Sequence, residues 1–202
     1  IIIALIVCTG IINAYNFMDG INGITGGYSL IILGALAYIN AEMVTFVEPA
    51  LIYTVLCSVV VFCFFNFRRK AKCFAGDVGS VSIAFILLFL IGKLILKTED
   101  FSWIILLAVY GVDSVLTIIH RLMLHENIGL PHRKHMYQLM ANELKMPHVV
   151  VALIYMVAQA VIIMGYISCQ SYGYTFLLCM VLLLGIVYIC FMKKFFALHQ
   201  PV

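Results

Sequence analysis

Charged residues are scarce in this chain of 202 residues, where Lys, Arg, Asp and Glu together make up only 10%. Soluble domains carry roughly 25% charged residues. Hydrophobic residues reach 65% of the chain, and the mean hydropathy is +1.14. This balance excludes a soluble globular protein, a disordered chain and a fibrous assembly, which leaves a polytopic membrane protein.

Other signals are missing as well. The formal net charge of +3 is too weak to indicate a nucleic-acid partner. The chain begins IIIALIVCTG, without Met or a positively charged leader, so we expect the tail of a membrane helix in a C-terminal fragment rather than a signal peptide. The seven Cys are odd in number and include no CxxC pair, so we expect small buried apolar side chains.

Long apolar runs predict the membrane-spanning helices, which need about 20 apolar residues each. With a shorter run at 1–12, we expect about seven transmembrane helices in a single domain over 1–202. The runs do not alternate as barrel strands do, and backbone groups in lipid must bond internally. We therefore predict an all-α membrane helix bundle. The six full-length runs are 24–41, 50–66, 80–96, 102–124, 148–169 and 174–192.

Basic residues are concentrated in alternate connections between these runs. Segments 13–23, 67–79, 125–147 and the tail 193–202, together with Arg121, hold ten of the twelve Lys and Arg. The positive-inside rule places this set in the cytoplasm. The unusual polar motifs lie in the same set, so we expect loops far apart in the sequence to converge on one cytoplasmic face and form a site there.

The first motif is NAYNFMDGINGITGG, at 13–27. Its Asn13, Asn16, Asp19 and Asn22 recur every three residues, which predicts one helical face carrying four amide or carboxylate groups. Such oxygen ligands suit a hard cation such as Mg²⁺, which keeps water and substrate phosphates as further ligands. The alternative is a helix cap with a turn, because Asn, Asp and Gly favour both.

The second motif, FAGDVGS at 74–80, places Asp77 between two glycines just before an apolar helix. A helix start offers free N–H groups and a positive dipole end to a phosphate. A Mg²⁺ would bridge the carboxylate and the phosphate, which otherwise repel each other. The alternative is that Asp77 only caps the helix, with help from Ser80.

Asp113 interrupts the run 102–124. An acid near membrane depth costs about 2.5–3.5 kcal/mol on insertion scales, so it needs a partner or a wet cavity. His120 and Arg121 lie seven and eight residues further along, on roughly the same helical face. An internal contact with one of them is as well supported as a role in a site.

The third motif, HRKH at 132–135, contains His132, Arg133 and His135. We favour phosphate binding here, because Arg contacts phosphates through two N–H groups at once. A zinc site is less favoured since no third ligand accompanies the histidines, and contact with lipid headgroups is a further alternative. The aromatic residues near these loops that could stack on a base are Phe17, Phe74 and Tyr137.

Together, NAYNFMDGINGITGG, FAGDVGS, a helix with Asp113 and Arg121, and PHRKHMYQ resemble the polyprenyl-phosphate N-acetylhexosamine-1-phosphate transferases of glycosyltransferase family 4. The last motif is most similar to the undecaprenyl-phosphate-dependent branch that initiates O-antigen. Members of this family have more membrane helices and an adjacent pair of aspartates upstream. This sequence contains no Asp-Asp pair, so the resemblance implies a C-terminal fragment.

The resemblance implies a multi-pass enzyme of the inner membrane whose active site faces the cytoplasm. It would transfer an N-acetylhexosamine-1-phosphate from a UDP-sugar to undecaprenyl phosphate and release UMP, as the first lipid-linked step of lipopolysaccharide or cell-wall polysaccharide synthesis. Membrane lipid is a further partner, nucleic acid is not, and a homodimer is left open. The alternatives are the phospho-N-acetylmuramoyl-pentapeptide transferase of peptidoglycan synthesis and, from another class, a membrane transporter.

The resemblance also assigns roles to single residues. Asn16 and Asp77 would hold Mg²⁺, or alternatively Mn²⁺, and Asp19 would lie beside the metal. Asn22 and the Gly23 backbone would contact uridine. The predicted catalytic group is Asp19, Asp77, His132, Arg133 and His135, and the further substrate-binding residues are Arg121 and Asp113.

Overall fold

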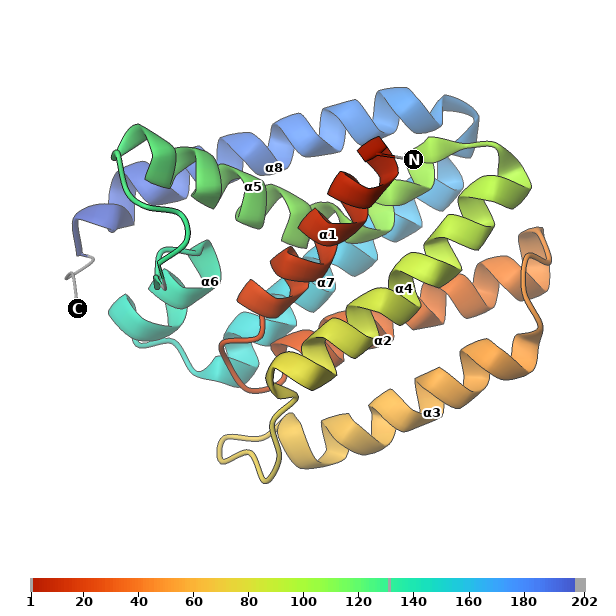
Figure 1. The fold of residues 1–202 in the computed structure, drawn as a ribbon, viewed down its shortest axis with the longest axis horizontal. Coiled ribbons are helices and arrows are strands. Elements are labelled where there is room, and N and C mark those ends of the chain that lie inside the picture. The colour runs from red at the N-terminus through yellow and green to blue at the C-terminus, as the bar shows by residue number, and fades with distance from the viewer. Residues whose placement is uncertain (1, 131, 199–202) are drawn as a thin grey trace.

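The computed structural model describes residues 2–130 and 132–198, and in this part of the chain it is an α-helical bundle without strands (Figure 1). Within the same residues, six segments are long and apolar enough to cross a membrane. A shorter apolar helix, Leu5–Phe17, corresponds to the run expected at the start of the chain. The all-α membrane bundle is confirmed. The six segments are Ile24–Met43, Pro49–Asn66, Gly76–Thr98, Phe101–Met123, His148–Ser168 and Gln170–Leu198.

The α-helices are separated by short turns of tighter or wider helix. A π-helical turn, Ile39–Met43, extends the second helix, and another, Leu139–Glu143, follows the sixth. A 3₁₀ segment, Phe101–Leu107, leads into the fifth helix. The α-helices in chain order are α1 (Ile2–Phe17), α2 (Ile24–Tyr38), α3 (Pro49–Asn66), α4 (Gly76–Thr98), α5 (Ala108–Met123), α6 (Met136–Gln138), α7 (His148–Ser168) and α8 (Gly173–Phe195).

Helix α2 lies in the middle of the bundle, between α3 and α7. Two glycines on it allow this close packing. A Cβ atom on Gly26 would lie 2.7 Å from the Sγ atom of Cys63 on α3, and one on Gly27 would lie 2.5 Å from the Sδ atom of Met156 on α7. The small-residue face of α2 is therefore a packing surface in the core.

Helices α3 and α8 turn most of their side chains away from the bundle. Only 17% of the apolar window of α3 and 11% of that of α8 are buried, against 61% for α2. The expectation that the cysteines are buried is therefore wrong: apolar residues on these helices meet the surroundings of the bundle rather than its core. Cys63 and Cys73 are half-buried, and the exposed cysteines are Cys8, Cys57, Cys169, Cys179 and Cys190.

A buried polar group fixes the junction at which the 3₁₀ segment becomes α5. The amide oxygen of Gln159 accepts from the Tyr28 hydroxyl (2.6 Å) and from the Val109 N–H (3.2 Å). Its amide nitrogen donates to the carbonyl of Ile105 (3.0 Å). The helix change frees backbone groups that must find partners inside a membrane bundle. Gln159 on α7 supplies them and so sets the direction of the helix that carries Asp113.

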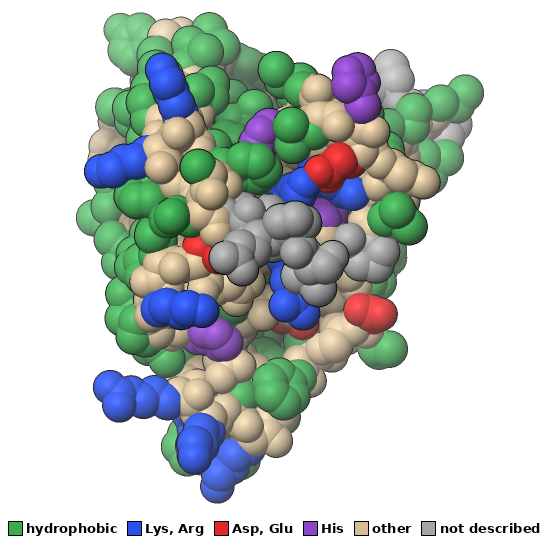
Figure 2. Space-filling model, turned by 90° about the vertical axis from the view of Figure 1, so that its left-hand side faces the viewer, with side chains coloured by type: hydrophobic (Ala, Val, Ile, Leu, Met, Phe, Trp, Pro, Cys, Tyr) green, Lys and Arg blue, Asp and Glu red, His purple; other side chains and the backbone are tan. Residues whose placement is uncertain are grey.

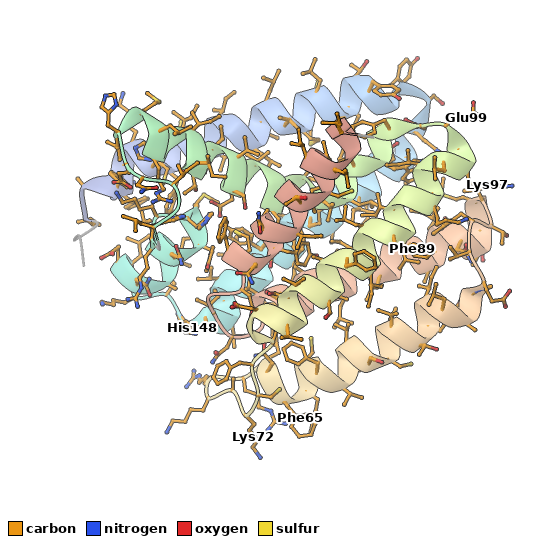
Figure 3. All side chains as sticks on the ribbon, viewed as in Figure 1. Phe65, Lys72, Phe89, Lys97, Glu99 and His148 are labelled. Atoms are coloured by element: carbon orange, nitrogen blue, oxygen red, sulfur yellow. The ribbon has the colours of Figure 1, made fainter. Side chains whose placement is uncertain are left out.

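The polar loops meet at one end of the bundle, as expected from the sequence. Lys72 and His148 lie at this end, and Lys97 and Glu99 lie at the opposite one (Figure 3). Figure 2 looks onto the first end and shows Lys, Arg and His side chains gathered on it. The convergence of distant loops is confirmed, while their cytoplasmic orientation stays a prediction. The predicted tail 193–202 is described only as far as residue 198.

Candidate active site

The first motif does not form a single helical face, so that prediction is wrong. Helix α1 ends at Phe17, and Asp19 and Asn22 lie in the loop that leads to α2. Two glycines explain the break. Gly23, the N-cap residue of α2, has a left-handed backbone (φ 86°), a conformation that glycine adopts at low cost. Gly20 passes directly under Tyr137, whose hydroxyl would be 2.2 Å from an added Cβ atom.

The end of α1 meets the first turn of α4. The side-chain amide of Asn16 donates to the carboxylate of Asp77 (3.1 Å) and to the hydroxyl of Ser80 (3.3 Å). Asp77 does not cap α4, because the N-cap position is Ala75 and no side chain bonds to the free N–H groups there. The half-buried Asn16 and the exposed Asp77 thus join the first two motifs across 61 residues of sequence.

Asp19 lies close to this pair. Burial raises the pKa of Asp19 above its usual range, and the neighbouring carboxylate of Asp77 raises it further. Two carboxylates that repel each other favour a bound cation. Among the described residues, no three His, Cys, Asp or Glu side chains form a metal site by themselves. A cation here would therefore need the amide oxygen of Asn16 and oxygens from a substrate, a donor set that fits Mg²⁺.

Asn22 and Gly23 use their donor groups to hold the basic loop between α3 and α4. The Asn22 amide donates to the carbonyls of Arg68 (3.1 Å) and Arg69 (3.4 Å). The Gly23 N–H donates to the side-chain oxygen of Asn66 (2.8 Å). The predicted contacts of Asn22 and Gly23 with uridine stay a prediction, and both residues already have a part in shaping the loop.

Asn66 is a site residue that sequence reasoning missed. It accepts from Gly23, and its amide nitrogen donates to the carbonyl of Cys73 (2.8 Å), so one side chain bridges two loops. The available signal was a polar amide at the end of an apolar helix, immediately before the basic residues. Asn66 is 6% exposed, which is typical of a bridging residue rather than a ligand-binding one.

The histidines of the HRKH motif lie in different surroundings. His135 is buried, with its ring centre 4.9 Å from that of His132 and 6.3 Å from that of Phe17. His132 is half-buried. Burial, the neighbouring His135 and the Arg121 guanidinium lower the pKa of His132 to about 4. His132 is therefore neutral at pH 7, whereas Arg133 is exposed and carries a charge. Pro131, the first residue of the longer motif, lies outside the described residues.

Arg121 is occupied by its own loop. Its side chain is buried and extends from the end of α5 to the turn that follows. There the guanidinium donates to the carboxylate of Glu126 (3.1 Å). Lys134 pairs with the same carboxylate. The role of Arg121 in substrate binding stays a prediction, and in the structure the guanidinium holds this turn together. The carbonyls that it also contacts are those of Asn127 (2.6 Å), Leu130 (3.1 Å) and Ile128 (3.3 Å).

The partners of Asp113 are not His120 or Arg121, so the alternative of an internal pair with one of these two residues is wrong. Eight residues of helix separate Asp113 and Arg121 by about 12 Å. The chain instead folds back after α5 and brings other partners to the carboxylate. The Tyr155 hydroxyl on α7 donates to it over 2.6 Å. Neither the fold-back nor Tyr155 had a signal in the spacing of the sequence.

Tyr137 is not available to stack on a base, in contrast to the expectation. Its side chain is buried, and its hydroxyl donates to the carbonyl of Phe17 (2.8 Å) at the end of α1. Phe17 and Phe74 are 43% and 73% exposed. Tyr137 therefore belongs to the framework of the site, and the two phenylalanines remain accessible.

Comparison with known proteins agrees with the motifs. Residues 1–95 match the model of glycosyl transferase family 4. Nearly half of the chain is therefore similar to glycosyl transferase family 4. The matched part of the family model includes Asn16, Asp19 and Asp77, and it ends before Asp113 and the HRKH motif.

Three proteins from different bacteria are similar to this chain. The chain is 32% identical over 133 residues to a probable undecaprenyl-phosphate N-acetylglucosaminyl 1-phosphate transferase of Bacillus subtilis, covering 63% of this chain and 37% of the relative. It is 35% identical over 74 residues to a phospho-N-acetylmuramoyl-pentapeptide-transferase of Lactobacillus acidophilus, covering 37% and 23%. It is 36% identical over 95 residues to a decaprenyl-phosphate N-acetylglucosaminephosphotransferase of Mycobacterium leprae, covering 43% and 24%.

The chain thus aligns with between 23% and 37% of the length of these relatives. No solved structure matches it.

Proposed function

We propose that the protein transfers an N-acetylhexosamine-1-phosphate from a UDP-sugar to undecaprenyl phosphate and releases UMP. The observation that carries the proposal is the hydrogen bond between Asn16 and Asp77, which joins the first two motifs beside Asp19. The names of the relatives support the reaction class, since they describe transferases of sugar phosphates and polyprenyl-phosphate acceptors.

The proposed reaction needs positioning and charge neutralisation more than it needs a strong base. A phosphate monoester has a second pKa near 6, so the acceptor is largely dianionic at pH 7. One of its oxygens forms a bond to the sugar-bearing phosphorus of the donor. The bond from that phosphorus to the bridging oxygen breaks, and UMP leaves with that oxygen. The main barrier is the crowding of negative charge around the reacting phosphorus.

Asp77, Asp19 and Asn16 are the residues that would hold a divalent cation, with Mg²⁺ as the expected ion. When bound, it would neutralise the donor pyrophosphate. Asn16 bonds to Asp77 and Ser80 through its amide nitrogen, which leaves its amide oxygen for a cation. Asp77 stands in the first turn of α4, where the dipole of the helix also favours anionic phosphate.

His132 and Arg133 would bind sugar or phosphate groups from the connection between α5 and α6. His132 is neutral at pH 7, and its Nδ1 atom accepts from the Lys134 N–H (3.4 Å), so the ring offers its Nε2–H as a donor without adding charge. Arg133 is exposed and offers a planar pair of donors to a phosphate. The two residues would share the work of recognition, one through hydrogen bonds and one through charge.

The location of the site fits both substrates. The acceptor is an isoprenoid that lies in the bilayer, and the donor is soluble in water. A site at the end of a membrane bundle, among ten of the twelve basic residues, meets both requirements. We place this end in the cytoplasm and the protein in the inner membrane, at the first lipid-linked step of a cell-surface polysaccharide.

A second candidate is the phospho-N-acetylmuramoyl-pentapeptide transferase of peptidoglycan synthesis, favoured by the 35% identity over 74 residues to such an enzyme. The two candidates differ only in the donor. UMP release should therefore be measured from the full-length protein in nanodiscs with undecaprenyl phosphate and each UDP-sugar in turn. Release with UDP-N-acetylglucosamine supports the first candidate, and release only with UDP-N-acetylmuramoyl-pentapeptide supports the second. No release from either donor by folded protein contradicts both.

A further inference from the structure

Asp113 is a buried acid in a membrane-spanning segment, and it holds together three elements of the fold. Its side chain is 2% exposed. One carboxylate oxygen accepts from the Tyr155 hydroxyl of α7 (2.6 Å). The other accepts from Thr117 on α5 (3.2 Å) and from the backbone N–H of Met136 in α6 (3.0 Å), and it lies 3.5 Å from the Nδ1 atom of His135.

The contacts of α6 continue from Asp113 to the loop that carries Asp19. Next to Met136, the Tyr137 hydroxyl donates to the carbonyl of Phe17 at the end of α1. The same hydroxyl lies against Gly20, the residue after Asp19, so closely that no Cβ atom fits. A continuous set of contacts therefore runs from a carboxylate inside the bundle to the loop at its end.

Burying a carboxylate inside the bundle costs more free energy than burying a neutral hydrogen-bonding group would. An acid at this depth costs a few kcal/mol, and hydrogen bonds to a charged acceptor are roughly twice as strong as neutral ones. Several donors arranged around one oxygen pair fix the position of α6 more tightly than apolar packing, which is non-directional. Such an arrangement fixes the position and direction of the HRKH segment, which leads into α6.

We propose that Asp113 is a positioning residue, which holds His135 and Met136 in place and, through Tyr137, the loop that carries Asp19. His135 then belongs to the framework, and His132 and Arg133 are left to face substrate. The inference deepens the proposed function and rests on it, because the loop matters for turnover only if Asp19 and Asp77 form the active site. No contact between Asp113 and a substrate is involved.

The first test is hydrogen exchange of the segment 132–138 in the full-length protein in nanodiscs, a readout that needs no activity. Asp113→Ala removes the acceptor, so exchange should become faster by about tenfold, the effect of losing one hydrogen bond to a charged group. Asp113→Asn has the same shape and still offers an oxygen to Met136, so it should keep most of the protection. Unchanged exchange in folded Asp113→Ala overturns the proposal.

A matched pair of tyrosine variants keeps the test decisive if Asp113→Ala does not fold. Tyr155 bonds to Asp113 itself, whereas Tyr188 bonds to the Thr117 hydroxyl (2.9 Å), one step further away. Tyr155→Phe should speed exchange in 132–138, and Tyr188→Phe, which loses the same hydroxyl group, should not. Equal effects of the two variants contradict the proposal.

Kinetics then separate this proposal from the proposed function. In full-length enzyme that releases UMP, Asp113→Ala should lower kcat by tenfold or more per folded molecule, and Asp113→Asn should recover a large part of it. An unchanged kcat in folded Asp113→Ala overturns the positioning role alone. Absence of UMP release in the wild-type protein, together with the expected exchange result, contradicts the proposed function but leaves Asp113 as the anchor of the segment.

Discussion

Arg133 can distinguish two interpretations of the HRKH motif, binding of a substrate phosphate and contact with lipid headgroups. It is exposed at the end of the bundle where the site lies. If it binds a substrate phosphate, Arg133→Lys should lower kcat/KM by tenfold or more, about 1.4 kcal/mol, because an ammonium does not reproduce the planar two-pronged contact. UMP release at saturating lipid measures this effect. Arg69→Lys, on an exposed side chain of another loop, is the matched control. Equal rates for Arg133 and Lys at this position would favour contact with lipid headgroups.

His132 predicts a dependence of stability on pH. Its pKa is lowered by burial from 6.5 to about 4 in the folded protein, so below pH 6.5 the unfolded state binds a proton that the folded state does not. The stability contributed by the neutral ring is complete above pH 6.5 and is lost as the pH falls toward 4. Melting temperatures in nanodiscs should therefore fall less steeply over this range for His132→Gln than for the wild type. His125→Gln, on an exposed side chain of the same connection, should leave the slope unchanged; a wild-type slope in His132→Gln contradicts the account.

At the scale of elements, the turn between α1 and α2 depends on the backbone of one glycine. Gly23 has a φ of 86°, and a Cβ atom there would lie 2.2 Å from the Phe67 ring. Gly23→Ala should destabilise the protein by about 1–3 kcal/mol, from backbone strain and overpacking together. Gly34→Ala is the control. Gly34 lies within α2, and a Cβ atom added there would meet no neighbouring group within 4 Å. Equal denaturation midpoints for the two variants in detergent would show that the turn does not need glycine.

The spans of the bundle could be predicted from the sequence, but the ends of the polar segments could not. Apolar runs mark lipid-crossing helices because the cost of exposing polar groups in a bilayer is large at every position. The turn that separates α1 from α2 depends instead on contacts between distant segments, Tyr137 against Gly20 and Phe67 against Gly23. The three-residue spacing of the first motif therefore predicted a continuous helix where the chain makes a turn.

The whole bundle must have one orientation in the membrane if the candidate site is to face the cytoplasm. Lys72 and Lys97 are exposed at opposite ends of the bundle (Figure 3). In a full-length background without native cysteines, Lys72→Cys should be protected from an impermeant maleimide in intact cells, and Lys97→Cys should be labelled. Labelling of both after permeabilisation confirms that the two sites are reactive. The reverse pattern in intact cells would place the candidate site outside the cell.

The gathering of motifs at one end could be predicted from charge, but the pairs within it could not. Ten of the twelve basic residues mark the end at which the loops meet. Which groups touch depends on how the chain folds back after α5. The spacing offered Asp113 only partners on its own helix, and besides Thr117 on α5 its carboxylate contacts α6 and α7. Arg121, assigned to a substrate, bonds to its own loop for the same reason.

The central claim is that Asn16, Asp19 and Asp77 form the catalytic centre of a sugar-phosphate transferase. The most direct test is UMP release by the full-length protein from UDP-N-acetylglucosamine and undecaprenyl phosphate, with Mg²⁺ and with a chelator. We predict release that requires the cation and falls at least about a hundredfold in Asp77→Asn, from the several kcal/mol that a catalytic metal supplies. Asp100→Asn, the same change in a residue that bonds to Ser102 at the other end of the bundle, should leave the rate unchanged. Near-wild-type release by folded Asp77→Asn would contradict the account.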